Sequence, residues 1–188
     1  MNKTDLSKYN NDWYKKSDLT RGFFISVLWF LTNSIFLNSY LLIPVALKRR
    51  ILRLFGAKIG KNVMIKHQVN IKYPWNLEVG DEVWLGEGLW IDNLGLVKIG
   101  ANACLSQGAM LLSGNHNYTK STFDLMIKDI IIEEGVWIGA KAVVCGGVTC
   151  FSHSILTVNS VATKNLEPYT IYQGNPAIRI RERDITVG

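Results

Sequence analysis

Aliphatic side chains recur at every sixth residue through the middle of the chain. The phase begins at Ile59, slips by two residues on two occasions, and resumes without a slip beyond residue 131. A strand period of two or a helix period of 3.6 would not hold a phase of six for so long. The pattern therefore indicates an internal hexapeptide repeat. Its aliphatic column comprises Ile59, Ile65, Ile71, Val79, Leu85, Ile91, Ile99, Leu105, Leu111, Ile132, Ile138, Val144, Cys150, Leu156 and Ala162.

Such a repeat has a simple physical solution. Three short strands joined by tight corners form one triangular coil, and each hexad points one aliphatic side chain at the coil axis. Stacked coils pair their backbones at about 4.8 Å, and glycines such as Gly60 and Gly139 suit the tight corners. The regular hexad predicts a left-handed parallel β-helix from about Ile59 to about Lys164, within a mainly β domain at 59–167.

The ends of a β-helix are open and need caps. We expect them from a helical N-terminal segment, residues 1–58, and a short C-terminal tail, residues 168–188. Within the first segment, residues 22–47 are mostly apolar but are interrupted by polar side chains and by Pro44. Four basic residues lie directly after them, between Lys48 and Arg53. Three alternatives stay open: helices that cap the protein, helices in peripheral contact with a membrane surface, and a spanning helix. The last fits least well, because spanning needs about 20 consecutive apolar residues.

Composition narrows the class of protein. Of the 188 residues, 48% are hydrophobic and 19% charged, which excludes a disordered chain. The net charge of +6 suits an anionic ligand or membrane face. Nucleic-acid binding has little support, because the basic residues lack interleaved aromatic side chains. The three cysteines are an odd number within the repeat and favour a reduced, cytoplasmic setting, with the inner face of the membrane left open.

The hexads fail between residues 112 and 131, and this predicted loop contains His116. Long loops in compact folds are usually functional or disordered, and a histidine there is well placed to act as a general base. The alternative is a surface histidine with local hydrogen bonds, and His67 and His153 fit that description. The three histidines are 49 and 37 residues apart, which matches no multiple of an 18-residue coil. The spacing therefore argues against a catalytic zinc site.

Several segments together resemble the hexapeptide-repeat acyltransferases, and most closely the acetyltransferases of colanic-acid and exopolysaccharide biosynthesis. The resemblance covers nearly the whole chain. It is carried by LRLFGAKIGKNVMIK at 52–66, VNIKYPWNLEVGD at 69–81, WIDNLG at 90–95, GNHNYTKSTFDL at 114–125, GVWIGAKAVV at 135–144 and YQGNPA at 172–177. Single hexads are weak evidence for an activity, whereas the GNH, WIGA and GNPA segments in that order are more specific. The resemblance implies acetyl transfer from acetyl-CoA to a sugar hydroxyl, in a homotrimer with sites between subunits.

The resemblance also implies roles for individual residues. His116 matches the catalytic histidine, while Asn117 follows it where the family often has an acid, so any carboxylate partner must come from elsewhere. Asp92 and Asn93 are candidates for holding the acceptor's hydroxyls, with an Asx turn at a coil corner as the alternative. Tyr118 and Asp124 from the loop are expected to line the acceptor pocket of the adjacent subunit, and Asn115 is a further candidate for substrate binding.

For CoA, the resemblance points to the late coils and the tail. Backbone groups would bind the pantetheine arm, and cationic side chains would meet the phosphates; a solvated charged end is the alternative for the basic tail. Trp137 is expected to pack at a coil corner rather than to contact adenine. The cofactor-binding candidates are Ala140, Val158, Thr163, Lys164 and Arg181.

The leading hypothesis is thus an O-acetyltransferase acting on a sugar or lipid-linked saccharide. One alternative is an amino-sugar N-acetyltransferase, or another small-molecule acetyltransferase of the same fold. A second is a non-catalytic β-helix scaffold, against which the loop around His116 argues.

Overall fold

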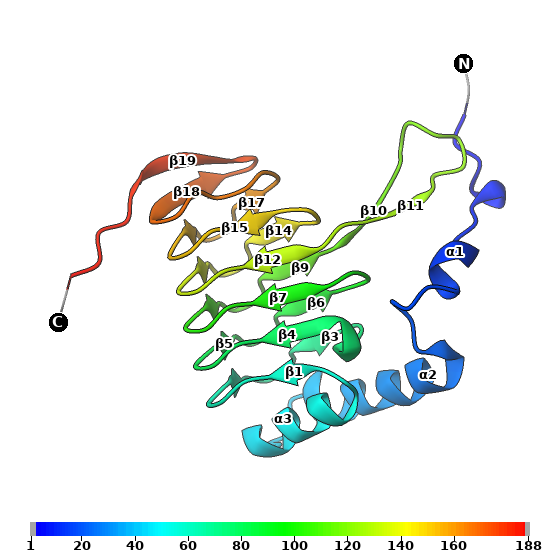
Figure 1. The fold of residues 1–188 in the computed structure, drawn as a ribbon, viewed down its shortest axis with the longest axis horizontal. Coiled ribbons are helices and arrows are strands. Elements are labelled where there is room, and N and C mark those ends of the chain that lie inside the picture. The colour runs from blue at the N-terminus through cyan, green and yellow to red at the C-terminus, as the bar shows by residue number, and fades with distance from the viewer. Residues whose placement is uncertain (1–2, 187–188) are drawn as a thin grey trace.

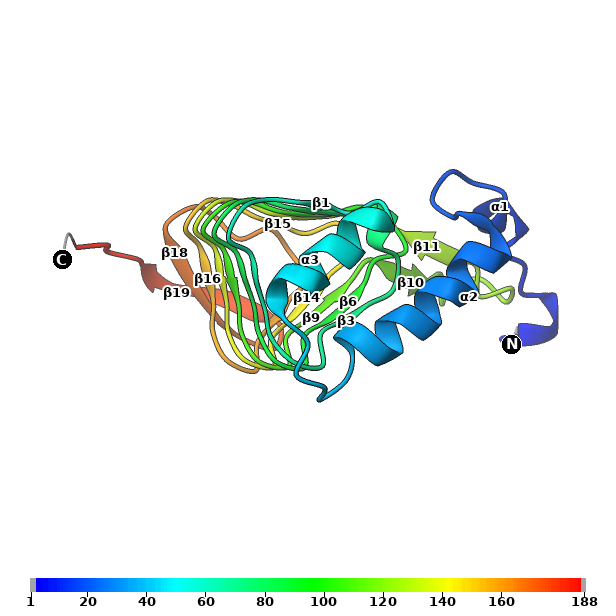
Figure 2. The same cartoon turned by 90° about the horizontal axis from the view of Figure 1, so that it is seen from below.

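The computed structural model describes residues 3–186, so the outermost two residues of each predicted cap lie outside the described chain. It contains a parallel β-helix with three flat faces (Figure 1). Viewed from the N-terminal end, the chain runs anticlockwise through the faces as it recedes, which makes the helix left-handed (Figure 2). The fold predicted from the hexads is confirmed.

Each face is one sheet of short strands, and successive coils contribute neighbouring strands. Sheet A comprises β1 (Lys58–Ile59), β4 (Leu77–Val79), β7 (Val97–Ile99), β12 (Ile130–Ile132) and β15 (Thr149–Cys150). Sheet B comprises β2 (Met64–Ile65), β5 (Trp84–Leu85), β8 (Cys104–Leu105), β13 (Trp137–Ile138), β16 (Ile155–Leu156), β18 (Thr170–Gly174) and β19 (Ala177–Glu182). Sheet C comprises β3 (Asn70–Ile71), β6 (Trp90–Asp92), β9 (Met110–Leu112), β14 (Val143–Cys145) and β17 (Val161–Ala162).

The core is the predicted aliphatic column. Leu85, Leu105 and Ile138 stack on sheet B with 0% of their surface exposed, and all other members of the column are buried. Neighbouring side chains in the strands point outward, because successive residues of a strand face opposite sides. The continuous apolar column is therefore the main source of stability in the β-helix.

The slips of two residues reflect longer early coils. Ile59 pairs with Val79, 20 residues on, whereas Ile132 pairs with Cys150, 18 residues on. The extra residues lie at the corner between sheets C and A, where one coil forms the short helix η3 (Pro74–Asn76). The side chains of the column stay in phase because the insertions stay outside the strands.

A two-stranded hairpin replaces the predicted loop at the same corner. β10 (Gly114–His116) pairs antiparallel with β11 (Leu125–Ile127), and Gly114 is opposite Ile127 at its base. The coil continues beneath it as if uninterrupted, since Ile99 on β7 pairs directly with Ile132 on β12. Figure 2 shows the hairpin projecting from one corner of the triangle.

Helices cover the N-terminal end of the β-helix. α3 (Val45–Leu54) buries Ile51 and Leu52 against the first coil, and its buried Lys48 Nζ donates to the Lys66 carbonyl at 2.8 Å. Burial lowers the pKa of the Lys48 amine. Pro44 precedes α3, as expected for a residue that cannot continue a helix.

The rest of the N-terminal segment runs beside sheet C toward the hairpin (Figure 2). It contains η1 (Leu6–Lys8), α1 (Asp12–Lys15), α2 (Gly22–Thr32) and the π-helical turn η2 (Asn33–Leu37). Trp29 anchors α2, because its indole Nε1 donates to the Ile71 carbonyl at 2.8 Å. No helix within residues 3–186 combines the length and apolarity needed to cross a bilayer.

The C-terminal tail extends sheet B. β18 pairs parallel with β16, and β19 then folds back antiparallel along β18. Arg183 fixes the end of this hairpin by donating to the carbonyls of Gly135 and His153 at 2.9 and 3.0 Å.

Candidate functional site

His116 is the last residue of β10, two residues after Gly114, where the hairpin leaves the coil corner. Its Nδ1 is 2.9 Å from the carbonyl oxygen of Phe123 on the opposite side of the hairpin. A carbonyl can only accept, so the neutral imidazole carries its proton on Nδ1. Nε2 is then the basic nitrogen, and the partner that fixes this tautomer is a backbone carbonyl rather than a carboxylate.

Two aromatic rings hold the imidazole in place. The Phe123 ring stacks on it with centroids 4.4 Å apart and an interplanar angle of 6°. Tyr9, from the N-terminal segment, lies on it at 5.6 Å and 58°. The same segment is tied to the hairpin by the backbone bond from Asp5 N–H to the Ser121 carbonyl, 2.8 Å long. The orientation of His116 therefore depends on contacts distant in sequence.

The other two histidines lie at coil corners. His153 has a left-handed backbone with φ of 59° and packs on Tyr169, while His67 is next to the left-handed Gln68. The corner positions agree with the repeat, but the expected local hydrogen bond is missing at His67, whose Nδ1 is buried without a partner among the described residues. Within residues 3–186, no group of three or more His, Cys, Asp or Glu side chains is placed to hold a metal ion.

The loop residues proposed for acceptor binding have different surroundings. Tyr118 is 80% exposed, and the Asn115 side chain accepts from the His116 N–H at 2.7 Å. Asp124 pairs with Lys120 at 2.9 Å, and hydrogen bonds from Thr122 and then Lys120 lower the pKa of its carboxyl. Asn115 and Asp124 thus both have bonds that stabilise the hairpin.

Asp92 and Asn93 are adjacent in sequence but have opposite environments. The Asn93 side chain is 0% exposed, accepts from Tyr73 N–H at 3.0 Å and donates to the Tyr73 carbonyl at 2.5 Å. These bonds occupy both ends of its amide and join two coils, so Asn93 has a structural role at the corner, although it bonds the preceding coil and forms no Asx turn with its own. Asp92 points outward from sheet C and forms an ion pair with Lys72 at 2.8 Å.

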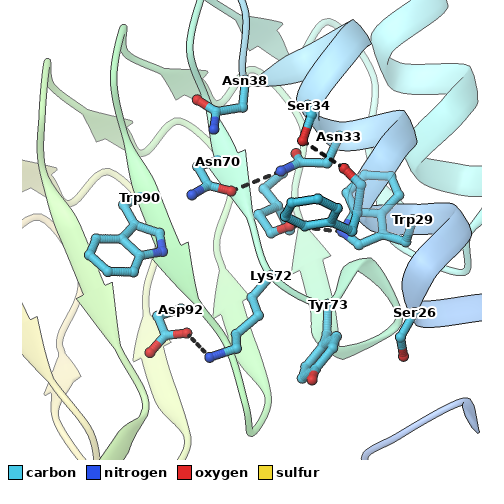
Figure 3. A pocket seen from close by; sticks show the side chains of 12 residues that line it. Ser26, Trp29, Asn33, Ser34, Asn38, Asn70, Lys72, Tyr73, Trp90 and Asp92 are labelled. Atoms are coloured by element: carbon cyan, nitrogen blue, oxygen red, sulfur yellow. Dashed lines mark hydrogen bonds and ion pairs between the residues drawn. The ribbon is translucent and has the colours of Figure 1, made fainter. Parts of the chain in front are cut away.

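Asp92 lines a cavity of about 350 Å³ between sheet C and the α2–η2 segment (Figure 3). Its walls carry aromatic rings, including Trp90, beside several amide and hydroxyl side chains. Asn33 donates through Nδ2 to Asn70 Oδ1 at 2.8 Å, while its buried Oδ1 has no hydrogen-bond partner among the described residues. Rings beside polar groups, with an acceptor left over, suit a polyhydroxylated ligand.

Sequence reasoning identified Asp92 in this cavity and missed Lys72, Asn70 and Trp90. The 20-residue spacing of the early coils was a usable signal, because Asn70 pairs with Trp90 in adjacent strands of sheet C. Lys72 and Asp92 have the same spacing on the same outward face. The contribution of Asn33 had no such signal, since it depends on how η2 packs on the coils.

A second cavity contains two of the cofactor candidates. Ala140 and Val158 line a space of about 350 Å³ at the corner between sheets B and C. Trp137 lines it too, donating from Nε1 to Ser106 Oγ at 2.9 Å, so it borders the cavity as well as packing at the corner. Gly139 is required there, because a Cβ would come within 2.5 Å of the Val158 backbone nitrogen.

The remaining cofactor candidates lie elsewhere. Thr163 and Lys164 are exposed and follow β17 at the corner between sheets C and A, which is the corner that carries the hairpin. Arg181 lies on β19, opposite Ile171, at the edge of sheet B. Within one chain the five candidates do not form a single site. The cavity with Ala140 and the hairpin with His116 lie at opposite ends of the strands of sheet C.

The cysteines are poorly suited to covalent catalysis. All three are free thiols. Burial raises the pKa of Cys104, Cys145 and Cys150, which disfavours the nucleophilic thiolate at neutral pH.

Comparison with known proteins adds independent information. No protein-family profile matches the sequence. The "Putative colanic acid biosynthesis acetyltransferase WcaF" of Escherichia coli K12 is 40% identical over 133 residues, which cover 71% of this chain and 73% of that protein. The galactoside O-acetyltransferase of the same organism is 28% identical over 129 residues, covering 67% and 64%. A hexapeptide-repeat acetyltransferase of Vibrio cholerae, solved with acetyl-CoA, superposes with a TM-score of 0.72 at 20% identity, covering 78% of this chain and 81% of that one.

Proposed function

This chain belongs to the hexapeptide-repeat acetyltransferases, and we propose that it transfers an acetyl group from acetyl-CoA to a sugar hydroxyl. The relative named for colanic acid biosynthesis supports a saccharide acceptor. The acetyl-CoA bound in the Vibrio structure supports the same donor here. A non-catalytic scaffold is set aside by membership of an enzyme family.

The observation that carries the proposal is the hydrogen bond of His116. Because Phe123 accepts from Nδ1, the lone pair of Nε2 is free to take a proton. A sugar hydroxyl is a weak nucleophile and needs such a base, whereas a free amine needs it less. This chemistry favours O-acetylation over the N-acetylation alternative.

In the proposed reaction, Nε2 removes the hydroxyl proton as the sugar oxygen attacks the thioester carbonyl. The tetrahedral intermediate collapses, its C–S bond breaks, and the CoA sulfur receives the proton from the imidazolium. The products are the acetyl ester and the free CoA thiol. Direct transfer agrees with the raised pKa values of the cysteines, which would otherwise be the candidates for an acyl-enzyme.

We assign the acceptor to the cavity beside Asp92, near the hairpin. The Ser113 backbone N–H, three residues before His116, donates to the Asp92 carbonyl at 3.2 Å, so the two elements are in contact. The Asp92 carboxylate would accept from sugar hydroxyls, and Trp90 offers an aromatic face for the apolar side of a sugar ring.

The separation of the two candidate regions supports a site shared between chains. Gln107 lines the Ala140 cavity. It is nine residues before His116, and because this stretch is mostly extended, at about 3.3 Å per residue, the two sites lie up to about 30 Å apart. A neighbouring chain that places its own cavity against the hairpin would bring donor and base together. We therefore propose the homotrimer that the resemblance implies, in which cyclic symmetry repeats this contact to give three such sites.

An acceptor panel tests the proposed reaction. Purified protein with acetyl-CoA should release free thiol faster when a suitable sugar is present, and mass spectrometry should show an ester that mild alkali removes. Amino sugars with the hydroxyls blocked serve as the matched control. Acetylation restricted to amines would replace this proposal by the N-acetyltransferase alternative.

Mixed assemblies test the shared site. His116→Ala removes the base, and Ala140→Trp fills the second cavity, so each variant alone should be inactive. Co-refolded mixtures should regain activity, since some sites combine an intact hairpin with an intact cavity. Trimers that stay inactive on mixing would place both groups in one chain.

A further inference from the structure

The α2–η2 segment is apolar on its outward side, while its inward side mixes polar residues with Trp29 and Leu37 of the hydrophobic core. Its inward side carries polar residues such as Ser26 and Asn33, which line the cavity of Figure 3, together with Trp29. Its outward side is apolar: Phe24 is 86% exposed and Leu28 57%. A helix on a water-soluble surface normally presents polar residues outward.

Several of the exposed apolar residues form a stripe, and Phe23 and Phe30 are exposed beside it. Phe24, Leu28 and Leu31 are spaced by four and three residues, which places them on one face of α2. Ile35 continues the stripe into η2, at 50% exposed, and Leu42 in the following turn is 88% exposed. Such a contiguous apolar surface is rare on a soluble monomer and marks an interaction site.

The charge around this stripe points to its occupant. Residues 19–77 contain nine Lys or Arg residues and no Asp or Glu. Arg49 and Arg50 lie on α3, which packs beside α2 at the same end of the β-helix (Figure 1). Neither forms an ion pair within the described chain. Lys58 and Lys72 are neutralised by Glu78 and Asp92 of the following coils, so the cations left beside the stripe are those of α3. This end of the molecule thus combines an apolar stripe with unpaired cations, as far as the described residues show.

An anionic lipid surface satisfies both properties. Apolar side chains would enter the boundary between headgroups and acyl chains, and the cations would meet the lipid phosphates. A second copy of this chain would cover the apolar stripe, but its net charge of +6 makes it a poorer match for the cations than an anionic lipid surface.

We propose that the α2–η2 stripe, with the adjacent turn and α3, docks this protein onto the surface of an anionic membrane. The proposal goes beyond acetyl transfer and does not depend on it. The helix lies in the membrane plane, and the cavity beneath its polar side faces the protein. A saccharide on a lipid carrier would then be presented beside that cavity.

Vesicle co-sedimentation of the full chain tests this docking. Vesicles of phosphatidylcholine mixed with phosphatidylglycerol should bind the protein, and phosphatidylcholine alone should bind it more weakly. The double variant F24S/L31S should weaken binding by at least 10-fold, as roughly expected from removing two large apolar side chains. Its matched control is I178S/I180S, which changes exposed apolar residues on β19 at the other end of the molecule and should bind as the parent does.

Two further measurements separate the outcomes. R49Q/R50Q should reduce the preference for anionic vesicles and the sensitivity of binding to salt. Light scattering should give the same oligomeric state for F24S/L31S and the parent protein. Failure of the parent to bind anionic vesicles overturns the proposal. So does an F24S/L31S variant that dissociates, since the stripe would then bind a second copy.

Discussion

The coils and the hairpin of this protein keep their side chains in place by different means. In the coils, residues such as Leu85 have 0% exposure and are packed above and below by equivalent residues of the next coil. In the hairpin, His116 is held by the carbonyl and ring of Phe123 and by Tyr9. Stability is thus concentrated in the repeat, and the proposed catalytic base lies in the interruption. The two can therefore be perturbed separately.

The variant His116→Ala should separate catalytic activity from stability most clearly. Loss of a general base typically costs about 10²–10⁴-fold in rate, and the side chain is outside the hydrophobic core. We expect that fall in kcat with an unchanged unfolding midpoint by denaturant titration. His67→Ala, at a coil corner, is the matched control and should keep parental activity. A His116→Ala enzyme with parental kcat would remove the chemical role of the hairpin.

Leu85→Ala should produce the converse effect. Truncating a fully buried leucine leaves a cavity and costs about 2–5 kcal/mol of unfolding free energy. The counterpart in the hairpin, Met126→Ala, should cost less than about 1 kcal/mol, because Met126 is already 37% exposed. Urea unfolding measures both values. Equal costs would mean that the hairpin and the coils form one cooperative unit in which stability is evenly spread.

Asp92→Asn tests whether a coil also contributes to the site. Losing a charged hydrogen-bond partner costs about 1.5–3 kcal/mol, which corresponds to an increase of about 10- to 100-fold in the acceptor's KM. The KM for acetyl-CoA should stay near its parental value. Glu78→Gln is a good control, since it removes the Lys58 ion pair on sheet A. Equal effects of both variants would make the Asp92 pair a purely structural one.

Phe123→Leu should have the smallest effect. It keeps the backbone carbonyl but removes the ring stacked on His116, a contact worth about 0.5–1.5 kcal/mol. We expect kcat to fall about 2- to 10-fold, with the acceptor's KM unchanged and the free energy of unfolding lowered by no more than the value of this contact. A change in KM alone would indicate that Phe123 contacts the acceptor instead of positioning the base.

The fold could be predicted because the hexad acts on every coil. Each residue of the column meets the same residue of the next coil, so one local rule repeated many times fixes the whole arrangement. The inward and outward alternation of successive residues in a strand could also have predicted that Asp92 and Asn93 have different environments. Ile91 points inward, hence Asp92 points outward and Asn93 turns inward again at the corner.

The candidate site was less predictable, because it depends on contacts between elements distant in sequence. The partner of His116 is a carbonyl, which any residue at position 123 would supply, so no side-chain motif reports it. Tyr9 reaches the imidazole across more than a hundred residues of chain. The five cofactor candidates all come from the last third of the chain, yet Thr163 and Ala140 lie at different corners of the β-helix. A cofactor site between subunits would require such a separation.

The paired base of the hairpin affects how proteins of this kind can diversify. Gly114 and Ile127 are neighbours, and Ile99 pairs with Ile132 whatever lies between the two coils. An inserted segment of any length can therefore begin and end at this corner without altering the pitch of the solenoid. Natural selection can lengthen, shorten or exchange the inserted hairpin while inheriting an unchanged scaffold. For the same reason, the corner is a suitable point at which to graft insertions from relatives with other acceptors.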